Sequence, residues 1–323
     1  MTVIVIVTGA AGFIGMHLSE RLLGLGHAVV GVDDFNAYYP VALKEARAAR
    51  LAAYERFGMV RLDVADAPAF EALAARVRPD LIVHLAAQAG VRYSLEQPFA
   101  YERANVAGHL SVLEACRQVG VIQLVYASSS SVYGDHPLGA EGFSETDPVN
   151  APASLYAATK RSCELMSTAY SGLYGLRQTG LRFFTVYGPW GRPDMAYYGF
   201  AQKIMAGEPI EVFGEGRMAR DFTYVDDIID GIIGVIDHPA AEGENRIFNI
   251  GDSRPVGLMR MIEVLEQALG RTAEKRMRPM QPGDVTATFA NVANLNRLCG
   301  YAPKVPIEEG LPRFVQWFQS FAS

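Results

Sequence analysis

The sequence Thr8-Gly9-Ala10-Ala11-Gly12-Phe13-Ile14-Gly15 sets the architecture that we expect for this chain. It follows Val3–Thr8, an apolar β-branched run typical of a buried strand, and it opens Phe13–Leu25, whose apolar residues have helical spacing. Glycines in such a turn let the backbone approach a pyrophosphate, whose charge the N–H groups and dipole of the helix start then hold. A tight strand–helix turn can show the same glycines, so the flanking strand and helix carry the argument. We predict a dinucleotide site with contacts at Gly9, Gly12, Phe13, Ile14 and Gly15.

Asp33 ends the second expected strand, Ala28–Asp33, 18 residues after Gly15. An acid at this place accepts hydrogen bonds from both hydroxyls of an adenosine ribose and repels a 2′-phosphate. The neighbouring Asp34 should point to the opposite side, because side chains alternate along a strand. The expected cofactor is therefore NAD rather than NADP.

The same alternation of strand and helix continues along the first half of the chain. A helix is expected over Pro40–Arg56, and short apolar strands over Met59–Leu62, Leu81–Leu85 and Ile122–Tyr126. Strands that are apolar on both faces and separated by helices predict a parallel sheet covered on both sides. The expected fold is therefore α/β, a doubly wound Rossmann sheet.

The pattern loosens after about residue 180, where Gly188–Pro193 is a loop rich in glycine and proline. Two later pieces, Asp221–Ile236 and Ile247–Ile250, are regular enough to rejoin the sheet. We expect an NAD-binding domain over residues 1–180 with returning segments near 218–250, and a smaller interleaved substrate domain over 181–323.

Composition excludes several classes of protein. Of the 323 residues, 50% are hydrophobic and 20% are charged, and the net charge is −6, which argues against nucleic acid as a partner. No apolar run approaches the ~18–20 residues that span a bilayer, and Val3–Val7 has no basic flank before it, so neither a membrane segment nor a signal peptide is expected. Three cysteines far apart indicate a reducing compartment, and the histidines lack metal-ligand spacing. We expect a cytoplasmic protein without a metal that acts on a small molecule.

Tyr156 and Lys160 stand four residues apart in Tyr156-Ala157-Ala158-Thr159-Lys160, at the start of an expected helix behind Pro152. Positions i and i+4 share one helix face, so the ammonium can lie beside the phenol. A nearby cation favours phenolate, which makes tyrosine a usable base near neutral pH. Because such pairs also occur on many surface helices, a second element is needed.

Four hydroxyls, Ser128–Ser131, supply that element, since they follow an apolar strand at the sheet edge where ligands bind. No G-x-S-x-G elbow surrounds them and no histidine is poised beside them, so a nucleophilic serine is not indicated. Serine, tyrosine and lysine after a dinucleotide turn predict a site that oxidises a hydroxyl to a ketone. Two further strand ends are candidates for cofactor contacts: Asp63-Val64, which is equally well read as a surface turn, and Leu85-Ala86-Ala87-Gln88.

These marks resemble the extended short-chain dehydrogenase/reductases over nearly the whole chain. More specific stretches are similar to the UDP-glucuronate 4-epimerase branch of the nucleotide-sugar epimerases: Phe35–Tyr39 running into Leu43-Lys44, Ala87–Ser94, Arg182–Asp194 and Arg220–Asp227. The resemblance implies that Tyr156 takes the proton of a sugar 4-hydroxyl and that Lys160 lowers the pKa of Tyr156 and holds the nicotinamide ribose. Ser129 would hydrogen-bond the 4-oxygen, with Ser128 and Ser130 beside it. NAD would take the C4 hydride, return it to the other face and stay bound.

The resemblance also bears on the substrate. Dehydratases carry an acidic pair, and UDP-glucuronate decarboxylases a glutamate, where this chain has Ser130 and Ser131. UDP-galactose 4-epimerases have asparagine in place of Thr185 and arginine in place of Gln281. Thr185 and Arg192 can together read a carboxylate, although Arg192 is also readable as a surface charge that stabilises its loop. The favoured activity is 4-epimerisation of UDP-glucuronate to UDP-galacturonate; the alternatives are a 4-epimerase of UDP-glucose and UDP-galactose, a UDP-glucuronate decarboxylase, and a non-catalytic NAD-binding scaffold.

The remaining contacts are implied by the resemblance alone. Arg220 would grip the diphosphate, and Phe213 would lie near the uracil, although a core aromatic is an equal reading. Further substrate contacts would be Arg92 and Asp284, and Asn105 would support the nicotinamide side. A homodimer is implied, with helices near Pro98–Val119 and Ala153–Tyr174 pairing with their copies.

Overall fold

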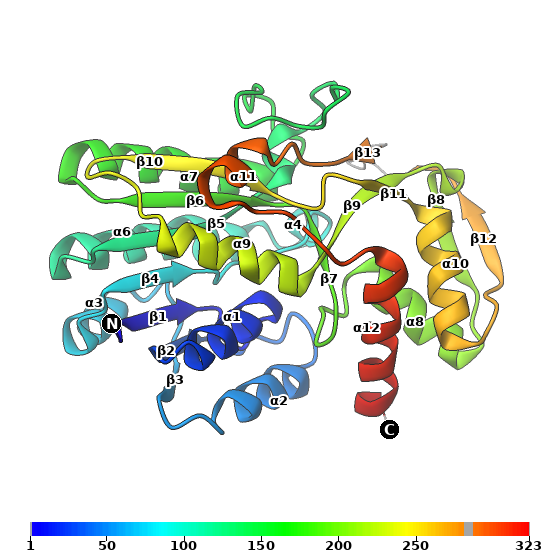
Figure 1. Ribbon diagram of the computed structural model, residues 1–323, viewed down its shortest axis with the longest axis horizontal. Helices are drawn as coiled ribbons and strands as arrows, with labels where there is room; N and C mark the ends of the chain where they lie inside the picture. The colour runs from blue at the N-terminus through cyan, green and yellow to red at the C-terminus, as the bar shows by residue number, and fades with distance from the viewer. Residues whose placement is uncertain (1, 281–286, 323) are drawn as a thin grey trace. The chain divides into compact units, whose positions relative to one another are not determined.

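A large sheet organises the N-terminal part of the chain (Figure 1). The computed structural model describes residues 2–280 and 287–322. The strands of this sheet are β1 (Ile4–Thr8), β2 (Ala28–Asp33), β3 (Phe57–Arg61), β4 (Leu81–His84), β5 (Gln123–Ser129), β6 (Gln178–Phe183) and β10 (Asn245–Ile250). Their order is β10-β6-β5-β4-β1-β2-β3.

The strand order reverses between β1 and β4. From β1 the chain proceeds outward through β2 and β3, then returns to β4 on the other side of β1 and continues through β5, and each of these pairings is parallel. This is the doubly wound arrangement, so the predicted fold class is confirmed. Ligands of such sheets bind outside the carboxyl ends of the strands, where the order reverses.

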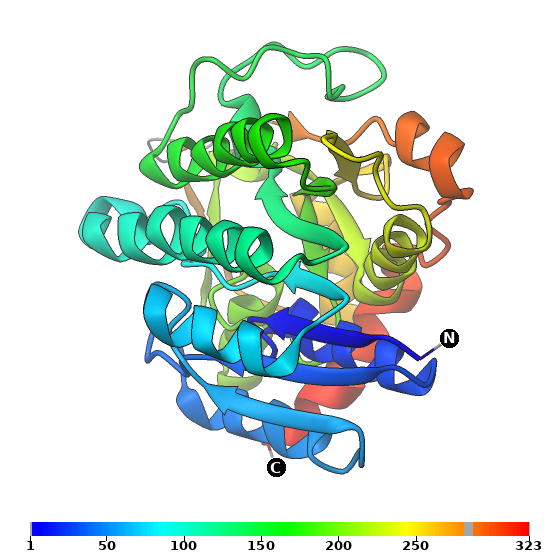
Figure 2. The same cartoon turned by 90° about the vertical axis from the view of Figure 1, so that its left-hand side faces the viewer.

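Helices cover both faces of the sheet (Figure 2). One face carries α1 (Phe13–Gly24) and α2 (Val41–Leu51), and the other carries α3 (Ala67–Val77), α6 (Gly108–Val119) and α7 (Leu155–Tyr174). The short helices α4 (Tyr93–Glu96) and α5 (Pro98–Tyr101) and a π-helical turn, η1 (Glu102–Ala107), lead into α6, and a 3-10 turn, η2 (Ser130–Tyr133), follows β5. Val5, Ile6 and Val7 on the central strand are fully buried, as a sheet covered on both sides requires.

Several element ends differ from the sequence expectations. The second helix ends at Leu51 rather than Arg56, because the chain then turns into β3, which starts at Phe57 in register with Val29 of β2. The fourth strand is shorter than expected and ends at His84. β5 continues through Ser129, so two of the four serines belong to the strand itself and point to opposite faces.

The chain divides into two compact units with interleaved segments. Unit 1 comprises Met1–Gly134, Pro148–Arg182 and Ile232–Phe248. Unit 2 comprises Asp135–Asp147, Phe183–Gly231 and Asn249–Ser323. Interleaving was expected, but the expected boundaries place 135–147 and 218–231 with the nucleotide domain, whereas both segments belong to unit 2.

In its described residues, unit 2 contains two smaller sheets. In the first, β9 (Ala219–Tyr224) pairs with β7 (Thr185–Tyr187), β11 (Pro255–Gly257) and β13 (Ala287–Thr288), and in the second, β8 (Ile210–Phe213) pairs with β12 (Lys275–Arg278). The helical elements are α8 (Ala196–Ala206), η3 (Gly214–Gly216), α9 (Val225–Asp237), which crosses the unit boundary, α10 (Leu258–Leu269), α11 (Ala293–Cys299) and α12 (Ile307–Ala322).

The strand expected near Asp221 does not rejoin the large sheet, and that expectation was wrong. Asp221 lies on β9, is fully buried, and accepts hydrogen bonds from the backbone N–H groups of Asp252, Ser253 and Ala290 at 2.6, 3.0 and 2.9 Å. A buried carboxylate needs such donors, and these come from segments of unit 2 far along the chain. The other returning strand, β10, does join the large sheet as expected.

Candidate active site

The glycine turn after β1 is packed so closely that side chains are excluded. Gly9 has φ +71°, and a Cβ there would lie 2.8 Å from the backbone nitrogen of Ala86. A Cβ on Gly15 would lie 2.1 Å from the carbonyl oxygen of Gly9. Helix α1 begins with no side-chain cap and no acidic residue in its first turn. Its first N–H groups therefore remain for an anion, as a bound pyrophosphate requires.

Asp33 lies beside this turn at the end of β2. Its side chain is buried, and its two oxygens accept hydrogen bonds from the backbone N–H groups of Ala11 and Phe35 at 3.1 and 2.9 Å. Burial raises the pKa of Asp33 above that of an exposed aspartate. Asp34 is exposed and instead accepts from Asn36, so the two acids diverge as predicted. The turn and Asp33 together fit an NAD molecule.

Two cations of α2 are buried, one against the glycine turn and one against the loop after β2, and the sequence reasoning assigned neither of them to the site. Arg47 is fully buried and donates to the carbonyl oxygen of Ala11 at 3.1 Å and to the Tyr39 hydroxyl at 2.8 Å. Lys44 is also buried and donates to Asn36 Oδ1 at 3.1 Å. The sequence does not indicate that this basic face of α2 is buried, because a helix rich in alanine and arginine is equally compatible with a solvent-exposed surface.

The strand ends after β3 and β4 show how the other cofactor candidates are held. The Asp63 carboxylate pairs with Arg103 at 2.8 Å, and Val64 is buried in the core of unit 1. In the stretch Leu85–Gln88, the N–H of Ala86 donates to Thr8 Oγ1 at 3.1 Å. These contacts fix both segments beside the ends of the central strands, and their contact with a cofactor stays a prediction.

Helix α7 presents the predicted tyrosine and lysine on its first two turns. Ser154 caps the helix by accepting from the N–H of Ala157 at 3.1 Å. Lys160 is buried, and its ammonium donates to the carbonyl oxygen of Ala127 on β5 at 2.9 Å. The Tyr156 ring meets the ring of Tyr101 edge-on, with centroids 6.0 Å apart. The structure therefore brings the lysine to the strand that carries the serines.

Asn105, in the π-helical turn, ties this helix to the loop after β4. Its amide nitrogen donates to the carbonyl oxygen of Gln88 at 3.1 Å and to Thr159 Oγ1 at 3.0 Å, and its amide oxygen accepts from the N–H of Gln88 at 2.8 Å. Thr159 in turn donates to the carbonyl oxygen of Tyr156 at 2.8 Å. These bonds give Asn105 a fixed position next to Tyr156, and its role on the nicotinamide side stays a prediction.

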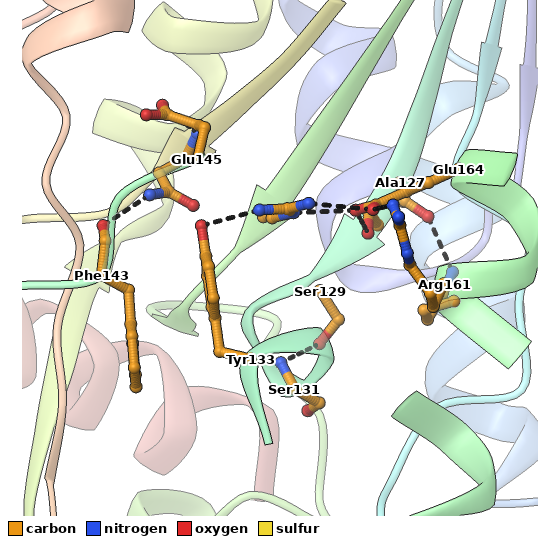
Figure 3. A network of polar contacts seen from close by, with 12 residues as sticks. Ala127, Ser129, Ser131, Tyr133, Phe143, Glu145, Arg161 and Glu164 are labelled. Atoms are coloured by element: carbon orange, nitrogen blue, oxygen red, sulfur yellow. Dashed lines mark hydrogen bonds and ion pairs between the residues drawn. The ribbon is translucent and has the colours of Figure 1, made fainter. Parts of the chain in front are cut away.

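The serines at the end of β5 are not equivalent. Ser129 Oγ accepts from the N–H of Ser131 at 3.1 Å, which orients it at the start of the turn η2 (Figure 3). Ser128 points to the other side of the strand and donates to Glu164 Oε1 at 2.6 Å. Ser130 opens the turn and is partly exposed. The structure therefore separates Ser128 from the hydroxyls that flank the predicted site.

A buried ion pair that the sequence reasoning missed lies behind these serines. Glu164 accepts from Arg182 Nε and NH2 at 2.8 and 2.9 Å and from Arg161 NH1 at 2.8 Å. Burial alone would raise the pKa of Glu164, but the hydrogen bonds and charge of Arg182 outweigh it and hold the pKa below the usual range. The spacing along the helix could have indicated a role for Glu164, since it follows Lys160 by four residues and therefore lies on the same helix face.

In unit 2, the two residues predicted to read a carboxylate lie on β7 and in the loop after it. Thr185 opens β7 and is partly buried. Arg192 forms a two-pronged ion pair with Asp194, with Nε–Oδ1 and NH2–Oδ2 distances of 3.0 and 2.5 Å. This ion pair supports the alternative interpretation of Arg192, in which its charge stabilises the loop. The binding role of Arg192 stays a prediction.

The remaining substrate candidates are spread over several elements. Phe213 ends β8 and is partly buried, and Arg220 on β9 donates to the carbonyl oxygen of Ala219 at 2.8 Å. Arg92 is exposed and immediately precedes α4. Asp284 and Gln281 lie outside the described residues.

Within residues 2–280 and 287–322, no group of histidine, cysteine, aspartate and glutamate is arranged to hold a metal ion. In the same part of the chain, no helix is both long enough and apolar enough to cross a membrane.

Comparisons with known proteins agree with this geometry. A family model described as the NAD dependent epimerase/dehydratase family matches residues 5–251. A probable UDP-glucuronate 4-epimerase of Rhizobium meliloti (strain 1021) is 46% identical, over 97% of this chain and 96% of its own length. A solved structure of UDP-glucuronic acid 4-epimerase from Bacillus cereus with UDP-glucuronic acid and NAD has a TM-score of 0.91 and 32% identity, over 98% of this chain and 99% of its own. A UDP-glucose 4-epimerase of Thermotoga maritima with UDP-glucose has a TM-score of 0.89 and 28% identity, over 99% of this chain and 100% of its own.

Proposed function

This chain belongs to the NAD dependent epimerase/dehydratase family, and we propose that it is an isomerase that converts UDP-glucuronate to UDP-galacturonate. The observation that carries the proposal is the meeting of Lys160 with the end of β5, next to Tyr156 and Ser129. The relatives named above, an epimerase of 46% identity and a solved epimerase with UDP-glucuronic acid and NAD, support the substrate. A non-catalytic scaffold would not need this set of residues.

Different residues of unit 1 have different roles in the oxidation of the sugar hydroxyl. Bound NAD would supply a reversible hydride acceptor for sugar C4, and because the same hydride would return to the opposite face, the cofactor would be regenerated in each turnover and stay bound. Tyr156 takes the proton of the 4-hydroxyl and later gives it back, and Lys160, one helical turn further on, would hold the nicotinamide ribose. Ser129 donates a hydrogen bond to the 4-oxygen. The bound cofactor is held by Gly9, Gly12, Phe13, Ile14, Gly15, Asp33, Asp63, Val64, Leu85, Ala86, Ala87, Gln88, Asn105, Tyr156 and Lys160.

Thr185 and Arg192 give the preference for an acidic sugar. Oxidation of a 4-hydroxyl beside a C5 carboxylate gives a β-keto acid, which loses carbon dioxide when the C–CO₂ bond aligns with the carbonyl π system. An epimerase must hold that carboxylate out of alignment. Asp194 holds the Arg192 guanidinium through Nε and NH2, so a substrate carboxylate would meet the NH1 and NH2 side of the guanidinium, and the Thr185 hydroxyl would add a further hydrogen bond.

The turn after β5 argues against dehydration and decarboxylation, the reactions of related enzymes. Ser130 and Ser131 occupy η2 and supply no carboxyl group that can act as the acid of an elimination. A second candidate, 4-epimerisation of neutral UDP-sugars, is favoured by the likeness to the Thermotoga maritima UDP-glucose 4-epimerase.

At the nucleotide end we assign Arg220 to the diphosphate, Phe213 to the uracil, and Arg92, Ser130 and Asp284 to further substrate contacts.

We also propose that the protein works in the cytoplasm as a homodimer. Leu165 and Leu173 on α7 are 54% and 72% exposed, and Phe99 and Leu110 near and on α6 are 83% and 41% exposed. These helices lie side by side (Figure 2), and large apolar side chains gathered on one face are typical of an interface. Sedimentation of the purified protein tests the dimer, and a monomer at micromolar concentration would contradict it.

Proton NMR of the purified protein with UDP-glucuronate, and separately with UDP-glucose, tests the activity without added NAD. UDP-galacturonate formed from the acid alone is the expected result. A UDP-pentose would mean that decarboxylation dominates, against the argument from Ser130 and Ser131. Turnover of UDP-glucose alone would establish the second candidate, and silence with both substrates would overturn the proposal.

The carboxylate contact has its own test. Arg192→Lys keeps the charge but loses the two-pronged geometry, and Thr185→Ala removes the hydroxyl. Both should raise the fraction of decarboxylated product in the same NMR assay. Unchanged product ratios would remove these residues from carboxylate recognition.

A further inference from the structure

Two successive turns of α7 are joined to successive residues at the end of β5. The Lys160 ammonium donates to the carbonyl oxygen of Ala127 at 2.9 Å, and one turn later Glu164 accepts from the hydroxyl of Ser128 at 2.6 Å. The next residue of the strand is Ser129. The position of Ser129 relative to α7, which also carries Tyr156, is therefore fixed from two points on the helix.

The second of these points is rigid because buried donors from Ser128 and Arg182 hold the Glu164 carboxylate. It accepts four hydrogen bonds: one from Ser128, two from Arg182 and one from Arg161. A carboxylate has about four acceptor sites, and two parallel bonds from a guanidinium hold it in one plane. The side chains of Glu164 and Arg182 are only 1% and 3% exposed, so water does not compete for these bonds.

Arg182 extends the same network to the far end of the serine turn. Its NH1 donates to the Tyr133 hydroxyl at 3.0 Å, and its guanidinium lies over the Tyr133 ring, 4.9 Å from the centroid. Tyr133 is the last residue of η2, the turn that Ser130 opens. Figure 3 shows the Tyr133 hydroxyl directed toward the ion pair at Glu164, with Arg161 approaching the carboxylate from the other side. The segment from Ser128 to Tyr133 is thus held at both ends by one buried ion pair.

We propose that Glu164 is a positioning residue for catalysis, which acts through Ser128 and through Arg182 and Tyr133 to set the distance between Ser129 and Tyr156. Ser128 is then part of this support and makes no contact with the substrate. Ser129 must donate to the same 4-oxygen whose proton Tyr156 takes, so a displacement of β5 against α7 misaligns both groups at once. Displacements of about 1 Å at a reacting centre can cost on the order of 10²-fold in rate.

Ser128→Ala is the decisive variant, since it removes the hydrogen bond between β5 and Glu164 and leaves the ion pair of Glu164 with Arg182 intact. We expect kcat for UDP-glucuronate to fall about 10-fold, a part of the loss that such displacements can cause, while KM and bound NAD stay unchanged. A substrate contact at Ser128 would show the opposite pattern, a raised KM with little change in kcat. Glu164→Gln is a poorer first choice, because it leaves the Arg182 charge buried and unpaired and risks loss of the fold.

Tyr133→Phe tests the other end of the network independently. It removes the hydroxyl that accepts from Arg182 and keeps the ring under the guanidinium, so a smaller fall in kcat, about two- to three-fold, is expected at unchanged KM. The matched control is Arg161→Gln, which removes the more exposed donor to the same carboxylate, with a side chain 30% exposed, and should keep the kcat of the parent protein. Thermal midpoints of all three variants show that the fold is retained.

Because this role rests on the proposed function, turnover of UDP-glucuronate by the parent protein is established first. Absence of that turnover counts against the proposed function and is seen before any variant is made. With an active parent protein, an unchanged kcat in Ser128→Ala, or a change confined to KM, overturns the positioning role. A fall in kcat in Ser128→Ala and Tyr133→Phe, but not in Arg161→Gln, supports it.

Discussion

The glycine turn after β1 and the serine segment at the end of β5 occupy the same edge of one sheet, but they are built differently. The turn is local: Gly9, Gly12 and Gly15 lie within seven residues, and their tight contacts are largely between backbone atoms. The serine segment depends on side chains from distant parts of the chain, since Lys160 follows Ala127 by 33 residues and Arg182 follows Glu164 by 18. An added side-chain atom should therefore disrupt the glycine turn, whereas loss of a side-chain group should disrupt the serine segment.

The largest effect is expected from Tyr156→Phe, on the helix that packs against the serine segment. If Tyr156 is the base that we propose, the variant lacks the group that takes the proton of the sugar hydroxyl, and loss of a positioned acid–base group costs typically about 10²–10⁴-fold in kcat. Steady-state turnover of UDP-glucuronate measures it. Tyr174→Phe at the exposed end of the same helix is the control, and it should leave kcat unchanged. Equal activity of the two variants would place the base elsewhere.

Gly15→Ala should break the glycine turn. The added methyl group would lie 2.1 Å from a backbone carbonyl oxygen, which no side-chain rotation relieves. We expect loss of bound NAD and a free energy of unfolding lower by about 1–3 kcal/mol, as for other overpacked sites. Gly24→Ala in the same helix is the matched control, because nothing lies within 4 Å of its added Cβ. It should keep NAD and gain about 0.5–1 kcal/mol, and retained NAD in Gly15→Ala would contradict the close packing.

Two buried histidines lie between the two regions and predict a pH dependence. His84 bonds with Thr8 Oγ1 at 2.8 Å, and the neighbouring His109 bonds with Ser167 of α7 at 2.8 Å. Burial, together with the Lys160 charge, lowers the pKa of His109 from 6.5 to about 3 and lowers that of His84 as well. The unfolded chain therefore binds these protons below pH 6.5 while the folded protein does not, so acid favours unfolding.

Each of these histidines should lower the free energy of unfolding by about 1.4 kcal/mol per pH unit as the pH falls below 6.5. For His109 this continues down to about pH 3. Urea unfolding at pH 7.0, 6.0 and 5.0 measures the slope. His109→Gln removes one titrating group, and its slope should be smaller by about the same 1.4 kcal/mol per unit. Identical slopes in the two proteins would show that His109 does not titrate on unfolding.

The smallest effect is expected from Cys163, a buried residue of α7. Cys163 donates to the carbonyl oxygen of Asn105 at 3.3 Å, and burial raises the pKa of its thiol to about 11. Iodoacetamide at pH 8 should leave Cys163 and the buried Cys116 unmodified and the activity unchanged, because thiolate is the reacting form. Peptide mass spectrometry measures the labelling, and the protein in urea is the control. Labelling of Cys163 in the native protein would contradict this packing.

Prediction from sequence succeeded where the signal is local. The strand–glycine turn–helix unit, the divergence of Asp33 and Asp34, and the start of α7 near Tyr156 all follow from residues close together in the chain. It failed for the strand at Asp221, whose partners are backbone groups 31 to 69 residues away. It also missed the burial of Arg47 and Glu164, since a charged residue on a helix reads as solvated until its partner is known.

The sequence by itself determined the doubly wound sheet, the dinucleotide turn and the tyrosine–lysine pair, because period, glycine spacing and helix geometry act over a few residues. Only the tertiary structure decided which serine faces which way. Ser128 and Ser129 are identical side chains on adjacent residues, yet one hydroxyl is bound by Glu164 and the other is oriented by the N–H of Ser131. Alternation along β5 separates them, and the buried ion pair of Glu164 with Arg182 fixes what each of them meets.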